Sequence, residues 1–411
     1  MIGNRGCRYS RSSIKIFSKN KDITVTITLS NLAFESDQYT EGLSVFCVGG
    51  AVRDALLHLP SGDKDWVVVG STPEEMVARQ FIPVGGDFPV FLHPITKEEY
   101  ALARTERKSG RGYQGFTFYT GKDVSLAEDL KRRDFTINAI ATDQQGNIYD
   151  PYQGVNDLNI KLFRHVSEAF VEDPVRILRL GRFLSRLSTF SVASETILLC
   201  RQMVCNGEVN ALVAERVWKE ISRALMEKEP QRCFTFLADI GALSIVIPLL
   251  HWDTSIGEYL VESAKRRLTL SQRYALLVWK SEQVKRLSQQ LRVAKEQADY
   301  AHYLPIVYKG FSELQGIQQL PMTSDQAHQI VSFIEQVDGI RKPERLWQLI
   351  EVCTIIHQMS VVQSIAYLDF WKTVLQKVKS VEAGQIAQQY KGQVEQIKIA
   401  VREVREGVLL G

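Results

Sequence analysis

The amino-acid sequence predicts an α+β fold: an N-terminal head with a small mixed β-sheet and helices, followed by an all-α neck, body and tail. Short apolar segments of strand length, separated by glycine- and proline-containing turns, recur up to about residue 166. Beyond that point helical periodicity replaces the strand pattern. A chain of 411 residues is long enough for two to four domains with large buried cores.

We expect four segments along the chain. Residues 1–43 should form an N-terminal extension, basic at its start and poorly ordered. The head should span residues 44–166, and a helical neck and body should span residues 167–250. A further helical body and tail should occupy residues 251–411.

The composition is that of an ordinary globular protein. Charged residues make up 24% and the net charge is only +3, so a nucleic acid would have to bind a local basic patch. No apolar run approaches the ~18 residues that a transmembrane helix needs. The six cysteines are scattered, without histidines at metal-ligand spacing, which favours reduced thiols. We therefore expect a soluble, cytoplasmic protein with no membrane association and no evident protein partner.

The head begins with an apolar strand over residues 45–48, the turn Gly49-Gly50 and a helix that contains Arg53. Glycine lets the main chain approach a ligand closely, and the N–H groups at a helix N-terminus attract phosphate. This order of elements favours the binding of a phosphorylated compound.

A strand with two carboxylates follows over residues 62–69. Because side chains alternate along a strand, Asp63 and Asp65 should point to one face. Neighbouring carboxylates suit Mg²⁺, which binds a few carboxylates together with substrate phosphates. Alone, such a pair is also typical of a solvated turn. After a glycine turn it indicates metal-assisted chemistry on a nucleotide.

The remaining head elements follow in order. Residues 72–75 predict a helix start, because Thr72 can cap the helix and Glu75 can close a capping box. Strands are predicted at residues 89–92, 99–104, 115–119 and 162–166. The basic, glycine-containing residues 105–114 are predicted to form a loop.

Three adjacent cations at residues 131–133 precede Asp134 and, four residues further, Asn138. Arginine suits bidentate contact with phosphate, and Asp and Asn side chains suit the hydroxyl groups of a ribose. A solvated helix end explains the first two cations but not the spacing from Arg133 to Asn138. In the neck, Asp173, Arg176 and Arg179 fall near one helix face. Alone, that pattern is typical of a surface salt bridge.

Together, the glycine turn and the carboxylate pair resemble the signature of the DNA polymerase β nucleotidyltransferase superfamily. The segments at residues 131–141, 172–183 and 214–220 narrow the resemblance to the class II tRNA nucleotidyltransferases, the CCA-adding enzymes, and to the related bacterial poly(A) polymerases. The resemblance is close from about residue 45 to residue 220 and weak elsewhere. It implies an enzyme that uses CTP and ATP to add and repair the 3′-terminal CCA sequence of tRNA.

The resemblance also implies a role for each candidate residue. Asp63 and Asp65 would be catalytic and hold Mg²⁺. The nucleotide would be held through its triphosphate by Gly50, Arg53, Arg133 and Arg179, through its ribose by Asp134 and Asn138, and through its base by Asp173 and Arg176. Cytosine and adenine both present an amino donor beside a ring-nitrogen acceptor, which an Asp acceptor next to an Arg donor complements. Uracil and guanine present the opposite order and would leave buried groups unpaired.

The helical half differs from that of many relatives, which carry a metal-dependent phosphohydrolase domain with a His-Asp pair. No His-Asp dipeptide occurs in this sequence, and residues 273–277, where the resemblance leads us to expect the pair, continue as Val278-Trp279. We therefore expect no such activity, and a helical surface that holds tRNA by phosphate contacts.

Three other functions remain open at this point. The first is a poly(A) polymerase on the same scaffold, against which the absence of a long basic tail argues mildly. The second is an enzyme that adds only A or only CC, and the intact basic loop argues against the CC-only version. The third is a non-catalytic RNA-binding protein, against which the intact Asp63, Asp65 and Arg133 argue.

Overall fold

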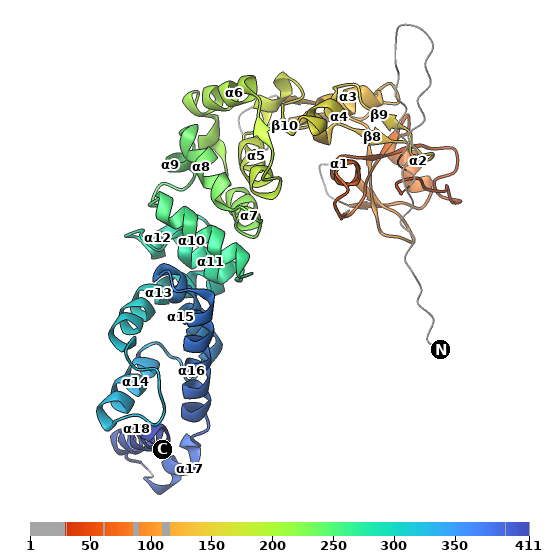
Figure 1. The fold of residues 1–411 in the computed structure, drawn as a ribbon. Helices are drawn as coiled ribbons and strands as arrows, with labels where there is room; N and C mark the ends of the chain where they lie inside the picture. The colour runs from red at the N-terminus through yellow and green to blue at the C-terminus, as the bar shows by residue number, and fades with distance from the viewer. Residues whose placement is uncertain are drawn as a thin grey trace, which may run out of the picture. The chain divides into compact units, whose positions relative to one another are not determined.

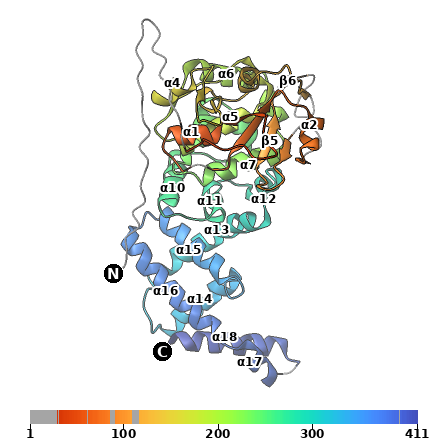
Figure 2. The same cartoon turned by 90° about the vertical axis from the view of Figure 1, so that its right-hand side faces the viewer.

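The computed structural model describes residue 29 and residues 31–60, 62–84, 90–108, 116–390 and 392–410. The chain divides into two compact units (Figures 1 and 2). The first, the head unit, comprises the residues up to 177 together with residues 189–212. The second, the helical unit, comprises residues 178–188 and the residues from 213 onward. The sheet lies in the head unit and the second unit is helical, so the predicted α+β class is confirmed.

The described part of the head unit is built around a seven-stranded mixed sheet in the order β3-β4-β5-β2-β1-β8-β9. Strands β2 and β5 run parallel, and the other neighbours are antiparallel. The strands are β1 (Ser44–Val48), β2 (Asp65–Val69), β3 (Ile82–Val84), β4 (Val90–Leu92), β5 (Glu99–Leu102), β8 (Ala141–Thr142) and β9 (Ile148–Tyr149). Small apolar side chains of β1, β2 and β8 form a buried core with Leu130 of a head helix.

Two smaller sheets and a set of helices complete the head unit. The hairpin of β6 (Thr105–Lys108) and β7 (Phe116–Tyr119) is antiparallel, whereas β10 (Leu162–Phe163) and β11 (Ser191–Val192) are parallel. The helices are α1 (Gly50–Leu56), α2 (Pro73–Ala78), α3 (Leu126–Lys131), α4 (Gly154–Asn159), α6 (Ser194–Cys205) and the 3-10 turns η2 (Thr136–Asn138), η3 (Glu168–Glu172) and η4 (Glu208–Ala211). The predicted start of α2 is confirmed: Thr72 and Glu75 form a capping box.

Several sequence-based boundaries shift. Strand β2 begins at Asp65, so Asp63 lies two residues before the strand rather than within it. The segment predicted as a loop from residue 105 is a strand as far as Lys108. The rest of that segment, residues 109–115, lies outside the described residues.

The expectation of a poorly ordered extension through residue 43 does not hold for residues 31–43, which pack on the head. Leu32 is buried, and the Phe34 ring meets Trp66 edge to face with a centroid distance of 4.5 Å. Asp37 pairs with the buried His93 of the loop after β4, at 3.0 Å between Oδ2 and Nε2. Apolar burial and these polar contacts make this segment part of the head unit.

The helical unit is a succession of packed helices (Figures 1 and 2). Its elements are α7 (Ala214–Leu225), α8 (Gln231–Asp239), α9 (Leu243–Val246), α10 (Thr254–Lys265), α11 (Leu270–Leu277), α12 (Val284–Gln290), α13 (Lys295–Leu314), α14 (Ser324–Gln336), α15 (Pro343–Ile356), α16 (Val361–Lys379), α17 (Ala383–Gln389) and α18 (Val394–Leu410). Helix α13 packs on α11 and α15, and α18 packs on α14 and α16. Within the described residues, no helix is long and apolar enough to cross a membrane.

The segment compared with the His-Asp pair of relatives, residues 273–277, lies in α11 and is part of the core. Arg273 is 4% exposed, and its guanidinium donates to the main-chain carbonyls of Leu225 and Leu268 at 2.7 and 2.9 Å. Tyr274 next to it is fully buried and bonds to Ser288. These side chains therefore hold helices and loops of the helical unit together.

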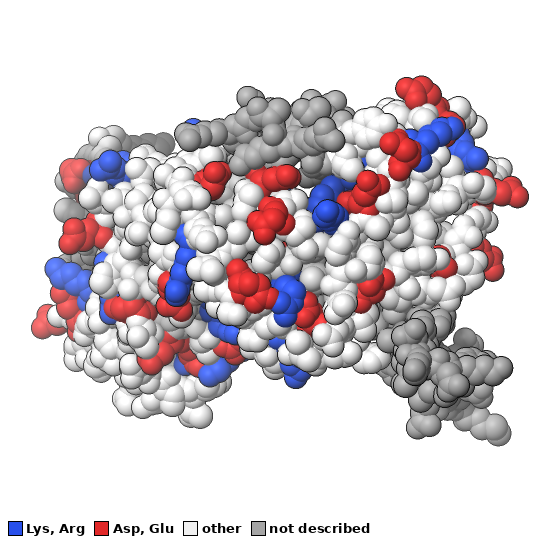
Figure 3. All heavy atoms as spheres, turned by 90° about the horizontal axis from the view of Figure 1, so that it is seen from above, with Lys and Arg blue, Asp and Glu red and all other residues white. Residues whose placement is uncertain are grey.

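Acidic and basic side chains are mixed on the face of the molecule that Figure 3 draws. On the face drawn in Figure 3, Lys and Arg side chains lie between Asp and Glu side chains, without a broad area of one sign. This pattern agrees with the small net charge of +3.

Candidate active site

Three of the segments singled out in the sequence meet at the end of strand β1. Val48, the last residue of β1, pairs with Asp65 of β2 on one side and with Ala141 of β8 on the other. The chain then turns through Gly49 into helix α1. Asp65, the glycine turn and the end of the 131–141 segment are therefore neighbours in space, although they are far apart in the sequence.

Gly49 is the constrained glycine of this turn. Its φ of 73° and ψ of −123° are accessible to glycine but strained for any other residue. A Cβ atom at this position would lie 2.9 Å from Nη1 of Arg133, whereas a Cβ atom on Gly50 would meet only Arg53 Nη2, at 3.7 Å. The sequence pointed to Gly50 as the ligand-binding glycine, but the local geometry depends more strongly on Gly49.

The candidate metal-binding carboxylates are exposed. Asp65 is the first residue of β2 and Asp63 lies two residues before it; both are exposed, and the strand becomes buried at Trp66. Glu99, the first residue of β5, pairs in register with Asp65 and is also exposed. Among the described residues no three His, Cys, Asp or Glu side chains already form a metal site. Two or three hard oxygen ligands fit a divalent cation that takes its remaining ligands from phosphates and water.

Sequence reasoning missed Glu99, because its neighbour across the sheet cannot be read from local periodicity. The sequence did predict a strand that starts there. An acidic residue at the first position of a strand was the available signal, but it is a weak one.

A buried polar network lies behind the glycine turn. Arg53 is 2% exposed, and its guanidinium donates to Asp54 Oδ1 at 2.8 and 2.9 Å and to Asn138 Oδ1 at 2.7 Å. The Asn138 amide in turn donates to Asp134 Oδ1 at 2.9 Å. The network joins α1 to η2 across 85 residues of sequence. Arg53, expected at the triphosphate, is thus placed where it holds Asn138 and Asp134.

Arg133 lies between a buried acid and the glycine turn. Its Nη2 is 3.3 Å from Oδ2 of Asp129, a fully buried residue of α3, and its Nη1 faces Gly49. The Asp129 carboxylate also accepts from Arg132 Nη2 at 2.6 Å and from the Arg104 main chain at 3.3 Å. Burial favours a raised pKa for Asp129, but the Arg132 and Arg133 guanidiniums and these hydrogen bonds hold its pKa below the ordinary value.

The residues expected to read the base lie at the start of α5 (Val175–Arg186). Asp173 Oδ1 accepts from the Val175 main-chain N–H at 3.2 Å. Arg176 is 8% exposed and donates from Nη1 to the Ala169 carbonyl at 2.6 Å and from Nη2 to the Arg132 carbonyl at 2.5 Å. These bonds fix the guanidinium beside the Arg132–Arg133 segment. Helix α5 continues into the helical unit, where Arg179 lies.

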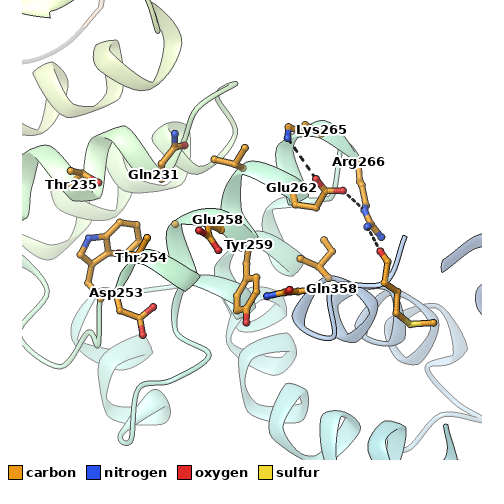
Figure 4. A pocket seen from close by; sticks show the side chains of 15 residues that line it. Gln231, Thr235, Asp253, Thr254, Glu258, Tyr259, Glu262, Lys265, Arg266 and Gln358 are labelled. Atoms are coloured by element: carbon orange, nitrogen blue, oxygen red, sulfur yellow. Dashed lines mark hydrogen bonds and ion pairs between the residues drawn. The ribbon is translucent and has the colours of Figure 1, made fainter. Parts of the chain in front are cut away.

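A groove of about 970 Å³ lies in the helical unit and contains none of the predicted site residues (Figure 4). Trp252, Asp253 and Glu258 line it together with Glu262 and Arg266, which are joined at 2.8 Å. Partial burial alone would raise the pKa of Asp253, but hydrogen bonds, among them one from Lys280, keep that pKa below its ordinary value. The groove thus presents both acids and bases of the helical unit, and its lining is separate from the candidate site residues of the head.

The mixed sheet, the glycine turn and the acidic edge together define a nucleotidyltransferase head. In agreement, residues 45–164 match the family model described as the poly A polymerase head domain. Residues 189–253 match the model described as a probable RNA and SrmB-binding site of polymerase A.

Relatives and solved structures narrow the class. The chain is 51% identical to a CCA-adding enzyme of Bordetella pertussis over 91% of this chain and 98% of that protein. The fold resembles that of the Bacillus stearothermophilus CCA-adding enzyme in complex with CTP, with a TM-score of 0.66 and 23% identity over 90% of each chain. A Thermotoga maritima CCA-adding enzyme complexed with tRNA has a TM-score of 0.67 and 19% identity, with 94% of this chain and 95% of that one covered. The chain belongs to the CCA-adding enzymes, the class II tRNA nucleotidyltransferases.

Proposed function

We propose that this protein adds and repairs the 3′-terminal CCA of tRNA, using CTP and ATP. The tRNA 3′-hydroxyl attacks the α-phosphate of the nucleotide in line, and pyrophosphate leaves. Each cycle joins one CMP or AMP to the tRNA by a new phosphodiester bond. The relative that is 51% identical is a CCA-adding enzyme, which favours this function over poly(A) synthesis.

The observation that carries the proposal is the meeting of three segments at Val48. Val48, which leads into the glycine turn, pairs with Asp65 on one side and with Ala141, the end of the 131–141 segment, on the other side. A triphosphate bound against the turn would therefore lie between acids that bind a cation and an arginine that binds phosphate.

The family implies a divalent cation, and we propose Mg²⁺ held by Asp63 and Asp65, with Glu99 beside them. When bound, the cation lowers the pKa of the attacking hydroxyl and offsets charge on the leaving pyrophosphate. The exposed position of these carboxylates leaves room for phosphate oxygens and water as further ligands.

The nucleotide is held by groups that differ in exposure. Arg133 contacts the triphosphate, with main-chain N–H groups near Gly50 and with Arg179 from α5. Asp134 and Asn138 bind the ribose hydroxyls through the network that the buried Arg53 stabilises. Arg53 thus acts on the sugar through Asn138 as well as adding positive charge near the phosphates.

Asp173 and Arg176 select the base. The Arg176 guanidinium is already oriented by two main-chain carbonyls, so reading a base does not require the side chain to be ordered first. A cytosine or adenine edge would satisfy the Asp acceptor and the Arg donor, whereas uracil or guanine would leave them unpaired.

The helical unit binds tRNA by contacts to the phosphate backbone. We infer that these contacts come from individual Lys and Arg side chains, which bind phosphates without reading the base sequence. The corresponding location for such an enzyme is the cytoplasm.

The test is incubation of the protein with tRNA that lacks CCA, Mg²⁺ and one nucleotide at a time. We expect two C residues with CTP alone, complete CCA with CTP and ATP, and no incorporation with UTP or GTP. Long A tails with ATP alone would indicate a poly(A) polymerase. Addition of A only to tRNA that already ends in CC would indicate an A-adding enzyme, and no addition would indicate a binding protein.

A further inference from the structure

Asp129 is a carboxylate near the glycine turn to which the resemblance assigned no role. The side chain is fully buried, at 0% exposure, although an isolated buried carboxylate is strongly unfavourable. The Asp129 carboxylate must therefore be stabilised by hydrogen-bond donors or cations. Which residues supply them indicates what Asp129 does.

The main donors are two adjacent arginines of the 131–141 segment. Arg132 donates to Oδ1 from Nε at 3.0 Å and from Nη2 at 2.6 Å, and Arg133 Nη2 lies 3.3 Å from Oδ2. The main-chain N–H of Arg104, between β5 and β6, adds a bond to Oδ1 at 3.3 Å. Both carboxylate oxygens are in use, and the acid faces two adjacent cations that would otherwise repel each other.

Arg133 is held from two sides. Asp129 lies at one end of its guanidinium. At the other end, Nη1 faces Gly49 so closely that a Cβ atom added to this glycine would lie 2.9 Å from Nη1. Its Nε is buried and has no hydrogen-bond partner among the described residues. The side chain is 18% exposed, so a small part of the cation reaches solvent beside the turn. An arginine fork held in this way loses little freedom when it binds phosphate.

We propose that Asp129 is a positioning residue for nucleotide binding, which holds the Arg133 guanidinium against the Gly49 turn; this rests on the proposed contact of Arg133 with the triphosphate. Because the triphosphate is common to both substrates, Asp129 serves CTP and ATP equally. The base-reading pair and the tRNA-binding surface do not depend on it directly. One buried carboxylate against two guanidiniums leaves the cluster a net positive charge for the incoming phosphates.

The test compares Asp129→Asn, Arg133→Ala and the double variant in steady-state addition of CMP and AMP. We expect Asp129→Asn to raise KM about tenfold for both nucleotides, the effect of weakening one charge-assisted contact, with KM for tRNA unchanged. In the Arg133→Ala background the same substitution should raise KM no further, because Asp129 acts through Arg133.

Asp157→Asn is the matched control. Asp157 is also a buried head carboxylate, 3% exposed, and it pairs with Thr136 and Arg164 but not with Arg133. A merely structural loss should affect both variants alike, whereas only Asp129→Asn should change KM for nucleotides. If Asp129→Asn does not fold, Asp129→Glu, which keeps the charge, takes its place. Nucleotide KM of this variant is then compared in the wild-type and Arg133→Ala backgrounds.

The inference is overturned if Asp129→Asn raises KM as much in the Arg133→Ala background as in the wild type. It is also overturned if KM for tRNA rises in parallel, or if Asp157→Asn has the same effect. A wild-type protein that adds no CMP or AMP, or an Arg133→Ala variant with unchanged nucleotide KM, would instead overturn the proposed function on which the inference rests, and the inference with it.

Discussion

The two halves of the candidate active site are built in opposite ways. Asp63 and Asp65 lie exposed at the start of an inner strand of the sheet, with Glu99 beside them. Arg53 and Asn138, by contrast, are 2% and 5% exposed and are bonded to each other behind the glycine turn. The exposed half presents carboxylate side chains at the protein surface. In the buried half, Arg53, Asn138 and Asp134 are hydrogen-bonded to one another inside the protein.

This contrast separates chemistry from positioning. A cation needs ligands that it can reach together with water and phosphate, so its carboxylates gain from exposure. The groups that orient the sugar and the phosphates gain from burial, because a low dielectric strengthens their hydrogen bonds and packing fixes their geometry. Substitutions in the exposed half should therefore reduce the rate without unfolding the head, whereas those in the buried half should affect binding and stability together.

The largest effect is expected for Asp63→Asn and Asp65→Asn. Either change removes a charged ligand from the cation site, and loss of metal-assisted stabilisation should lower kcat by ~10³-fold or more. The melting temperature should stay close to that of the wild type, because both side chains are exposed. Single-turnover rates and thermal unfolding measure the two quantities. Glu41→Gln, an exposed carboxylate of the same unit, is the control, and near-wild-type rates for both Asp variants would contradict the site.

Gly49→Ala comes next and tests the buried half. The new Cβ atom would lie 2.9 Å from Arg133 Nη1 on a backbone with φ of 73°, so either the turn or the arginine has to move. We expect nucleotide KM to rise by about tenfold or more and stability to fall by about 1–3 kcal/mol. Gly50→Ala, whose Cβ atom would have room, should have the smaller effect on stability. Equal effects of the two changes would show that Arg133 does not depend on the shape of the turn.

The sequence indicated residues of both halves, but it did not predict the contacts that join the buried half. The fold class followed from periodicity, and the glycine turn and the acidic pair are contiguous patterns that can be read within a few residues. The bond from Arg53 to Asn138 crosses 85 residues, and no local pattern contains it. Asp129 gave no signal either, because an acid in a helix four residues before an arginine is usually a surface pair. Asp129 differs from such a surface pair because it is buried, and its burial follows from the fold rather than from the local sequence.

The N-terminal segment was misjudged for a related reason. Residues 31–43 precede the part of the chain that resembles the family, so we expected them to belong to an extension. Leu32 and Phe34 nevertheless pack on the head, and main-chain bonds join Leu29 to Gly146 and Phe34 to Gln144. A few well-placed contacts with a preformed surface are enough to order a segment that could not form a core alone.

Base selection should show an intermediate effect. Asp173→Ala and Arg176→Ala should each lower the preference for CTP and ATP over UTP and GTP by roughly 5- to 150-fold, since a lost hydrogen bond is worth about 1–3 kcal/mol. Arg176→Ala should also destabilise the head, because its guanidinium binds the Ala169 and Arg132 carbonyls, whereas Asp173→Ala should do so less.

Single-turnover incorporation of all four nucleotides measures this selectivity, with Arg201→Ala on the exposed side of α6 as the control. Should both variants keep the wild-type preference, the two residues are structural, and the base is read by other groups. A loss of stability in Arg176→Ala without a change in selectivity would place that arginine with the buried, positioning half of the site.

The smallest effect on the rate is expected for Leu32→Ala, which tests whether the N-terminal segment belongs to the positioning half or only supports the fold. Leu32 is 1% exposed, and its truncation should cost about 2–4 kcal/mol of stability and several degrees of melting temperature. Leu32 is not one of the candidate site residues, so kcat and nucleotide KM of the folded protein should match the wild type below the unfolding transition. Asn31 is an exposed neighbour, so Asn31→Ala should change neither the melting temperature nor kcat. A fall in kcat with an unchanged melting temperature would show instead that this segment acts on the active site.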